Sequence, residues 1–351
     1  MPAALSAELE VAVAAVRRAA RVTAAVQMSL VRAQTLQKQD RSPVTVADFA
    51  SQAVVCAELA EGFAADSIVA EENADVLRRG ENAALAALVA EHAGMVLGKI
   101  SQTEVLDWID RGAPGPSPAS SARSPSPGVS ERFWTLDPID GTKGFLRGEQ
   151  YAIALALIQH GQIVLGVLGC PNFPAPVEPG EPGAPGDLGL LVAATVGAGA
   201  TALPLDGVGI SGGAALRVSD DGEPSAARFC ESVESGHSDQ GHAAAVAQCL
   251  GIRTGPMRMD SQAKYAAVAR GDASIYLRLP TSRDYRENIW DHAAGTIVAE
   301  QAGGRVSDIT GRSLDFSHGP RLEQNRGIVA TNGRLHDAVI KAVGSVRTGS
   351  G

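Results

Sequence analysis

Residues 133–145, Phe-Trp-Thr-Leu-Asp-Pro-Ile-Asp-Gly-Thr-Lys-Gly-Phe, constrain the fold of this chain more than any other stretch. The first four residues suit a buried strand. We expect the strand to break at Pro138, because proline has no N–H to give to a sheet and fixes its own φ. Gly141 permits a tight bend, and Thr142 can then cap a short helix.

Two carboxylates, Asp137 and Asp140, lie on either side of this break. Their spacing can turn both toward one point, and the backbone carbonyl of Ile139 can point the same way. Three converging oxygen donors suit a hard cation such as Mg²⁺. The alternative is an ordinary turn, since Asp, Pro and Gly are the commonest turn residues. Taken alone, the motif leaves both interpretations open.

The composition is that of a globular protein with room for two packed subdomains: 351 residues, 45% hydrophobic and 20% charged. The sequence has no apolar run of ~18 residues, so we expect no transmembrane helix and no membrane partner. The net charge of −9 argues against a nucleic-acid partner. An acidic chain can still bind phosphate, because divalent cations invert the local charge. Four widely separated cysteines predict reduced thiols in a cytosol-like compartment.

Alternating helical and apolar segments predict a layered α/β or α+β architecture with both sheet faces covered. Residues 151–158 and 162–168 flank a His-Gly pair and predict a hairpin. Pro-rich stretches at 112–130 and 173–187 predict surface insertions. The expected helices are 5–37, a second from residue 44, 81–99, 239–250, 262–269, 290–301 and 333–343, and the other expected strands are 67–70, 188–193, 199–203, 229–232, 273–279, 305–308 and 327–331.

Further candidate residues stand at the ends of these elements. Glu71 follows the strand 67–70, and Asp291 opens the helix at 290. Thr45 and Asp48 have the spacing of a capping box, so Asp48 is most simply a cap. His292 has packed neighbours and is expected to be buried and structural. A site made only of carboxylates suits phosphate chemistry, because Mg²⁺ ions hold phosphate, activate water and stabilise the leaving oxygen.

The central motif, together with Glu71-Glu72 and the segment Trp-Asp-His-Ala-Ala-Gly at 290–295, resembles the lithium-sensitive, magnesium-dependent phosphatases of the inositol monophosphatase superfamily. The resemblance extends over about residues 5–343. Segments 143–150, 235–238, 260–265 and 276–280 are similar to its 3′(2′),5′-bisphosphate nucleotidase branch. The resemblance implies the αβαβα-layered α+β sugar-phosphatase fold shared with fructose-1,6-bisphosphatase. We expect residues 1–203 to carry the metal site and both insertions, and residues 204–351 to bind the nucleotide.

The resemblance also assigns roles to individual residues. Two or three Mg²⁺ ions would be held by Glu71, Asp137, the Ile139 carbonyl, Asp140 and Asp291. Asp48 and Thr142 would orient and activate a water that attacks the 3′-phosphate of adenosine 3′,5′-bisphosphate, which releases AMP and phosphate. The substrate would be bound by Thr142, His237, Ser261, Lys264, Arg278 and Asp291.

Several expectations about function follow from the same resemblance. The sulfated relative, 3′-phosphoadenosine 5′-phosphosulfate, carries the same 3′-phosphate and is expected to be a second substrate, which points to sulfur assimilation or nucleotide clearance. Inhibition by Li⁺ is also expected. The alternatives are an inositol mono- or polyphosphate phosphatase of the same fold and a non-catalytic, metal-dependent nucleotide sensor. We expect a cytoplasmic monomer, and the sequence leaves a plastid or mitochondrial form open.

Overall fold

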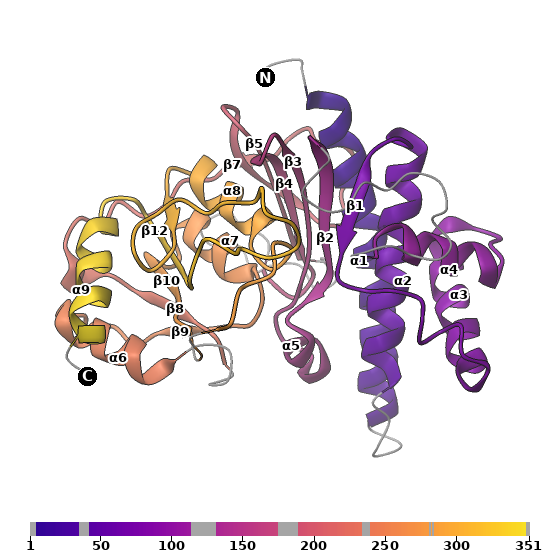
Figure 1. Ribbon diagram of the computed structural model, residues 1–351, viewed down its shortest axis with the longest axis horizontal. Coiled ribbons are helices and arrows are strands. Elements are labelled where there is room, and N and C mark those ends of the chain that lie inside the picture. Colours follow the sequence, from indigo (N-terminus) through magenta and orange to yellow (C-terminus); the bar gives the residue numbers. More distant parts are fainter. Residues whose placement is uncertain are drawn as a thin grey trace.

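Five alternating layers of helices and sheets make up the molecule (Figure 1). The computed structural model describes residues 5–34, 42–113, 131–174, 189–233, 239–280, 282 and 284–348. The long helices α1 (Ser6–Gln34) and α2 (Ser42–Gly62) cover one face of the first sheet. The two sheets are separated by α7 (Ala263–Arg270) and α8 (Ala293–Gln301), and the outer layer consists of α6 (Gln240–Cys249) and α9 (His336–Thr348). This order confirms the expected αβαβα fold class.

The first sheet holds seven strands in the order of the chain. They are β1 (Ser67–Ala70), β2 (Arg132–Asp140), β3 (Ala152–Gln159), β4 (Gln162–Cys170), β5 (Leu190–Thr195), β6 (Gly199–Pro204) and β7 (Ala214–Ala215). The pairing of β1 with β2 is parallel, and each later pair is antiparallel. His160 and Gly161 join β3 to β4 with φ values of 49° and 74°. Two left-handed residues are what a type I′ turn requires, so the predicted hairpin is confirmed.

The second sheet is smaller and has the order β11–β12–β10–β8–β9. Its strands are β8 (Phe229–Glu231), β9 (Met257–Arg258), β10 (Ile275–Arg278), β11 (Arg305–Ser307) and β12 (Ile328–Thr331). Three apolar cores fill the spaces between layers: one under α1 and α2, one around α7 and α8, and one under α6 and α9. The predicted division of the chain near residue 204 stays a prediction; the first sheet continues to β7.

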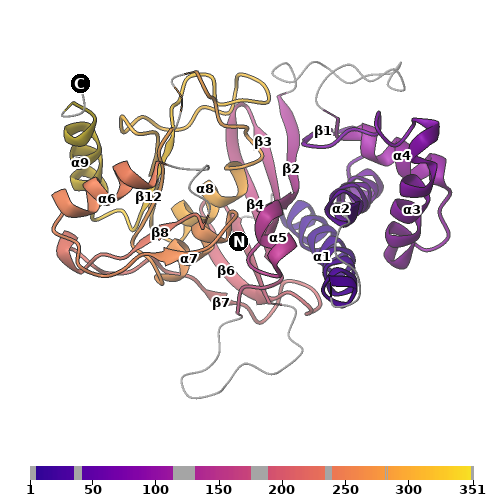
Figure 2. The same cartoon turned by 90° about the horizontal axis from the view of Figure 1, so that it is seen from below.

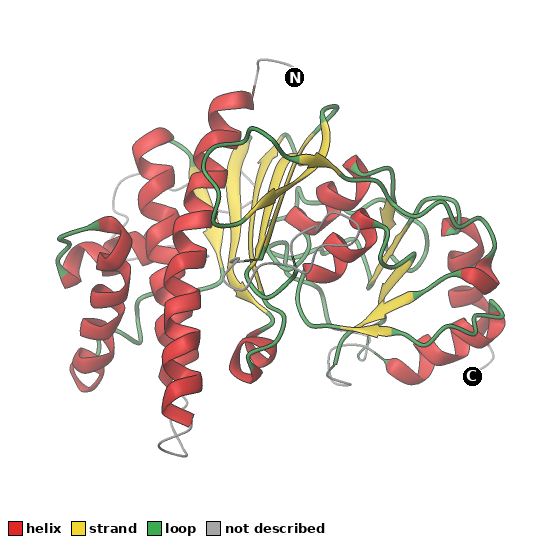
Figure 3. Ribbon diagram, turned by 180° about the vertical axis from the view of Figure 1, so that it is seen from behind, coloured by secondary structure: helices red, strands yellow, loops and turns green. Residues whose placement is uncertain are grey.

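Two further helices complete the outer side of the first layer. They are α3 (Ala83–Leu97) and α4 (Gln102–Arg111), and both contact α2 (Figures 2 and 3). Ser101 begins α4 with a capping box that it shares with Glu104. Across the described residues, no single helix has both the length and the apolar character to cross a membrane; the bent pair Gly80–Leu97 and Gln102–Arg111 passes that test only in combination.

Three local expectations were wrong. Strand β2 does not break at Pro138 but continues to Asp140, and its pairing register with β3 shifts between Asp137 and Asp140. Such an irregularity accommodates a residue without an N–H. Gly141, with φ 87°, is the N-cap of α5 (Thr142–Arg147), so Thr142 is not the cap.

The third correction concerns Asp48. Helix α2 begins at Ser42, so Asp48 lies inside the helix and does not cap it. The predicted insertions at 112–130 and 173–187 lie largely outside the described residues, and His237 also lies outside them.

Candidate active site

The parallel pairing of β1 and β2 forms the first part of the site. Its register places Ala70 opposite Leu136. The next residues along the chain, Glu71 just past the end of β1 and Asp137 near the end of β2, therefore lie side by side. Their carboxyl groups are close enough to hydrogen-bond to each other. Two predicted ligands from distant parts of the chain are thus brought together.

The irregular end of β2 places the second carboxylate of the motif. The N–H of Ile139 donates to Asp137 Oδ1 at 3.1 Å, which folds the Asp137 side chain back onto its own turn. Beyond the register shift, Asp140 Oδ2 accepts the backbone N–H of Gln262 at 2.6 Å. The motif is therefore anchored to the start of α7 as well as to the first sheet.

One face of α2 lies against this motif. Asp48, Ser51 and Gln52 share that face, because residues three and four apart are neighbours on a helix. Ser51 Oγ donates to the Pro138 carbonyl at 2.9 Å, and the Gln52 amide bonds to the backbone of Glu72. Asp48 is buried; burial and then the charges of Glu72 and Glu71 hold the pKa of Asp48 well above its usual value. Neither Ser51 nor Gln52 was predicted, although their spacing from Asp48 was a usable signal.

Asp291 reaches the site from the opposite side, just before α8. The Arg278 guanidinium lies 3.9 Å from its carboxylate and 2.7 Å from that of Glu287. Glu287 also contacts His292 Nε2 at 3.2 Å, and His292 Nδ1 lies 2.9 Å from the Tyr265 hydroxyl. His292 is completely buried, which confirms its expected structural role.

The side chains of Glu287, Asp291 and His292 also place possible ligand atoms within 4.8 Å of one another. The guanidinium of Arg278 already supplies positive charge at this point. We therefore assign no metal to this group.

Burial and nearby negative charge raise the pKa of the carboxylates at the strand ends. Burial and then the charges of Glu71, Asp140 and Asp291 hold the pKa of Asp137 well above its usual value. Desolvation and then Asp291 are the main causes that raise the pKa of Glu71 to about 8, even though the residue has exposed surface. Like charges this close ionise together only beside compensating cations. An oxygen-only donor set of this kind fits Mg²⁺.

Two positive side chains lie on the Asp140 side of this group. Burial and then Asp291 raise the pKa of Asp140, while Lys264 and Arg278 act in the opposite direction. Lys264 is buried; its Nζ lies 3.4 Å from the carbonyl of Met259. Burial lowers the pKa of Lys264, and the charge of Asp140 opposes that shift. The structure therefore brings both predicted cationic residues to the carboxylates.

The loop before α7 touches the central motif at a glycine. Ser261 has φ 69°, a rare value for a residue with a side chain, and is buried. A Cβ at Gly141 would lie 2.9 Å from that of Ser261, so the close approach requires glycine. This contact places Ser261 against Gly141, the residue before Thr142, and Thr142 is exposed at the start of α5.

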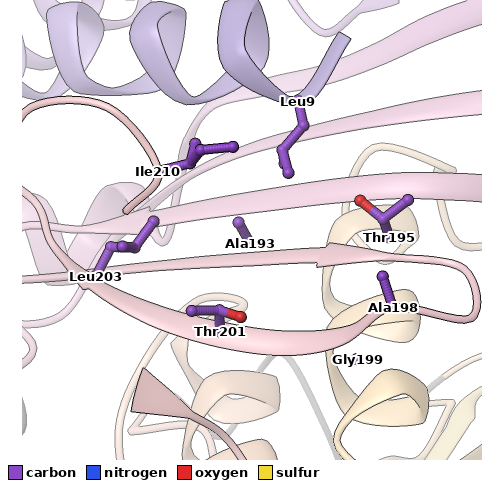
Figure 4. A pocket seen from close by; sticks show the side chains of 8 residues that line it. All are labelled: Leu9, Ala193, Thr195, Ala198, Gly199, Thr201, Leu203 and Ile210. Carbon is purple, nitrogen blue, oxygen red and sulfur yellow. The ribbon is translucent and has the colours of Figure 1, made fainter. Parts of the chain in front are cut away.

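A separate apolar pocket lies between α1 and strands β5 and β6 (Figure 4). Its lining includes Leu9, Ala193, Leu203 and Ile210, with two threonine hydroxyl groups. The lining has no charged side chain, so it does not suit a phosphorylated substrate. We assign it no chemistry.

The sequence profile of the inositol monophosphatase family matches residues 5–348. A 3′(2′),5′-bisphosphate nucleotidase of Emericella nidulans is 42% identical over 331 residues, which cover 89% of this chain and 90% of that protein. The enzyme of the same name from Schizosaccharomyces pombe is 42% identical over 352 residues, with coverages of 97% and 96%. The solved structure of a Thermotoga maritima IMPase has the same fold, with a TM-score of 0.60, 19% identity and coverages of 98% and 99%. The chain therefore belongs to the inositol monophosphatase family.

Proposed function

We propose that this protein is a magnesium-dependent 3′(2′),5′-bisphosphate nucleotidase that converts adenosine 3′,5′-bisphosphate to AMP and phosphate. The observation that carries the proposal is the meeting of Glu71, Asp137, Asp140 and Asp291 beside Lys264 and Arg278. The 42% identity to nucleotidases over most of the chain supports this choice of substrate. The sulfated nucleotide with the same 3′-phosphate is a second proposed substrate.

The proposed metal ligands are Glu71, Asp137, the Ile139 carbonyl, Asp140 and Asp291. Bound Mg²⁺ supplies charge that holds the phosphate and lowers the pKa of a nearby water. Burial and then Asp291 raise the pKa of Glu71, and burial and then Glu71 raise the pKa of Asp137. These increases support the ligand set, because such a cluster needs cations to stay ionised.

Asp48 and Thr142 are proposed to orient the attacking water and remove its proton. A carboxyl group with a raised pKa is a better proton acceptor near neutral pH than an ordinary one. Burial raises the pKa of Asp48 in this way. Thr142 begins α5, and α5 contacts α2, the helix that carries Asp48. The two side chains therefore belong to adjoining elements.

Lys264 and Arg278 are proposed to bind the second phosphate of the nucleotide. The second phosphate needs donors of its own in addition to the metal ions at the reacting phosphate, and Arg in particular binds phosphate through paired donors. Ser261, Thr142 and Asp291 are the other proposed contacts in the described structure. His237 is proposed from the sequence resemblance alone. The cytoplasmic location and the monomeric state stay predictions.

A substrate panel tests the proposal. Phosphate release is measured with Mg²⁺ on adenosine 3′,5′-bisphosphate, its sulfated relative, inositol 1-phosphate and inositol 1,4-bisphosphate, with and without millimolar Li⁺. We expect the nucleotides to react fastest and Li⁺ to inhibit. Faster release from inositol 1-phosphate would favour the inositol phosphatase alternative. Tight nucleotide binding without turnover would favour the sensor.

A matched variant sharpens the panel. Lys264→Ala should reduce kcat/KM for adenosine 3′,5′-bisphosphate far more than for inositol 1-phosphate, because only the nucleotide has a second phosphate. Equal losses of kcat/KM on both substrates would show that Lys264 does not bind the second phosphate of the nucleotide.

A further inference from the structure

Two buried glutamines, Gln52 on α2 and Gln262 just before α7, bond to the protein backbone in the same way. Their exposed fractions are 0% and 2%. Each side-chain amide donates to a backbone carbonyl and accepts a backbone N–H, and that backbone belongs to a segment with carboxylates of the site. We propose that Gln52 and Gln262 are positioning residues for the magnesium ligands, an inference that rests on the ligand set of the proposed function.

Gln52 holds the segment that follows β1. Its Nε2 donates to the Glu72 carbonyl at 2.7 Å, and its Oε1 accepts the Glu72 N–H at 3.0 Å. The pairing between β1 and β2 ends at Ala70. The amide therefore replaces the sheet hydrogen bonds where they stop, and it fixes the course of the chain directly after Glu71.

The surroundings of Gln52 keep its amide in place. Nε2 also donates to the carbonyl of Ile109 at 2.8 Å. A Cβ at Gly112 would lie 3.1 Å from the same nitrogen, so the neighbouring chain packs directly on the amide. The side chain has little freedom to turn away from Glu72.

Gln262 links two proposed ligands from different layers. Its backbone N–H donates to Asp140 at 2.6 Å, at the end of the first sheet. Its side-chain Nε2 donates to the Trp290 carbonyl at 2.8 Å, and that carbonyl belongs to the peptide bond leading into Asp291. One residue thus sets the separation between Asp140 and Asp291.

The same side chain also caps α8. The first N–H groups of a helix have no partner within it. The N-cap residue, His292, makes no side-chain cap. Gln262 Oε1 instead accepts the Gly295 N–H at 2.9 Å. The start of α8, and with it Asp291, is therefore tied to Gln262 in addition to its local backbone bonds to Ile289.

Methionine substitutions test the proposal. Gln52→Met and Gln262→Met keep the length of the side chain and remove both hydrogen-bonding groups. Loss of a group that orients metal ligands typically lowers metal affinity about 10–100-fold. We expect calorimetric titration of the metal-free variants with Mg²⁺ to show a weakening of this size. The Mg²⁺ concentration needed for half-maximal activity should rise in parallel.

Asn332 provides a matched control. It is a buried amide that donates to the carbonyls of Ser219 and Asp221 and accepts the N–H of Leu335, so it makes the same kinds of bond away from the carboxylates. Asn332→Leu should lower the melting temperature of the metal-free protein and leave Mg²⁺ affinity unchanged. The comparison separates a general loss of stability from displacement of ligands.

The outcomes are distinguishable. Glutamine variants that lose stability like Asn332→Leu but keep wild-type Mg²⁺ affinity would overturn the inference. A wild-type protein that binds no Mg²⁺ would instead overturn the proposed function. Gln52→Asn and Gln262→Asn retain an amide that is one methylene too short, and they replace any methionine variant that does not fold. The same weakening is expected from them, and wild-type affinity in a folded Asn variant would also refute the role.

Discussion

Two neighbouring clusters of charged side chains differ in the signs of the charges that they contain. The strand-end cluster, Glu71, Asp137 and Asp140, contains only carboxylates, and burial raises the pKa of all three. The Arg278 cluster, Arg278 with Glu287, contains both signs. Burial alone would raise the pKa of Glu287, but the hydrogen bond to His292 and the charge of Arg278 lower it overall.

The contrast shows that burial does not decide the charge state of a carboxylate; its partners do. The opposite charges of the Arg278 cluster balance each other, so Glu287 can hold the Arg278 guanidinium in a fixed place. Within the described part of the chain, the cations that act on the strand-end cluster are Lys264 and Arg278, on its Asp140 side. The cluster is therefore suited to further cations from solution. Asp291 stands between the two, 3.9 Å from Arg278 and close enough to raise the pKa of Glu71.

The largest loss of activity is expected from a substitution in the strand-end cluster. Asp140→Asn keeps an oxygen for the Gln262 N–H but removes a charged ligand. Ligand charge of this kind contributes several kcal/mol to the transition state, so kcat/KM should fall by about 10³-fold or more. The melting temperature of the metal-free protein should not fall, because one like charge is gone. Steady-state kinetics and thermal unfolding measure the two quantities.

Asp337→Asn is the control for this variant. Asp337 is 89% exposed on α9, and its partner is Arg305. The substitution should leave kcat/KM unchanged. A wild-type rate for Asp140→Asn would show that the strand-end cluster does not bind the catalytic metal.

A substitution in the Arg278 cluster should lower the stability of the metal-free protein, whereas Asp140→Asn should not. Arg278→Met leaves Glu287, 3% exposed, without its cation. Removal of one partner from a buried pair costs about 3–5 kcal/mol. Urea unfolding of the metal-free protein should show a loss near the lower end of this range, since Arg278 retains some exposure to solvent. This stability loss is the reverse of the result expected for Asp140→Asn.

A double variant separates stability from binding. Arg278→Met with Glu287→Gln removes both charges and should recover most of the lost free energy of unfolding. It should not recover the KM for the nucleotide, because the phosphate-binding cation is still absent. Recovery of both would show that Arg278 only stabilises the fold.

The strand-end cluster and a buried histidine outside both clusters, His336, should give opposite pH dependences of stability. The folded protein raises the pKa of Glu71 from 4.5 to about 8. The metal-free folded state therefore binds more protons than the unfolded chain between these values, and stability is lost as pH rises through that window. The buried His336, with its pKa lowered to about 4, acts the other way and gains stability as pH rises up to about 6.5.

Melting temperatures at pH 6.5 to 8.5 avoid the His336 window and cover the upper part of the Glu71 window. We expect a fall with rising pH when EDTA is present and a smaller fall with saturating Mg²⁺, because burial raises the pKa of Glu300 to about 7 and Mg²⁺ does not remove the loss that this residue causes. At 100 times its Kd, a ligand adds about 2.7 kcal/mol to the folded state. A metal-free melting temperature that is constant or rises across this range would contradict the coupling of the carboxylates.

The sequence was sufficient to predict much of the fold and to identify the individual carboxylates of the candidate site. Strand and helix ends marked Glu71, Asp137, Asp140 and Asp291, because charged residues directly after apolar segments stand out in a chain. Their meeting could not be derived from spacing, since it depends on the parallel register of Ala70 with Leu136. That register is a long-range pairing with no local sequence signal.

Other predictions from the sequence were wrong or could not be made, for physical reasons. Pro138 suggested a strand end, but the register shift lets β2 continue past it. Asp48 resembled a cap because the true start of α2, at Ser42, lies three residues before Thr45. Gln262 gave no signal, and Gln52 gave only its helical spacing from Asp48, because a buried amide becomes recognisable only when its backbone partners are known.

The smallest effect is expected at the edge of the Arg278 cluster. Tyr285 is 44% exposed, and its hydroxyl hydrogen-bonds to Arg278. Tyr285→Phe removes one such bond, with a net value of about 0.5–1 kcal/mol, while Glu287 still holds the guanidinium. The KM for adenosine 3′,5′-bisphosphate should rise roughly two- to five-fold, with kcat and the melting temperature unchanged. A fall in kcat instead would place Tyr285 at the reacting phosphate and would join the two clusters into a single catalytic unit.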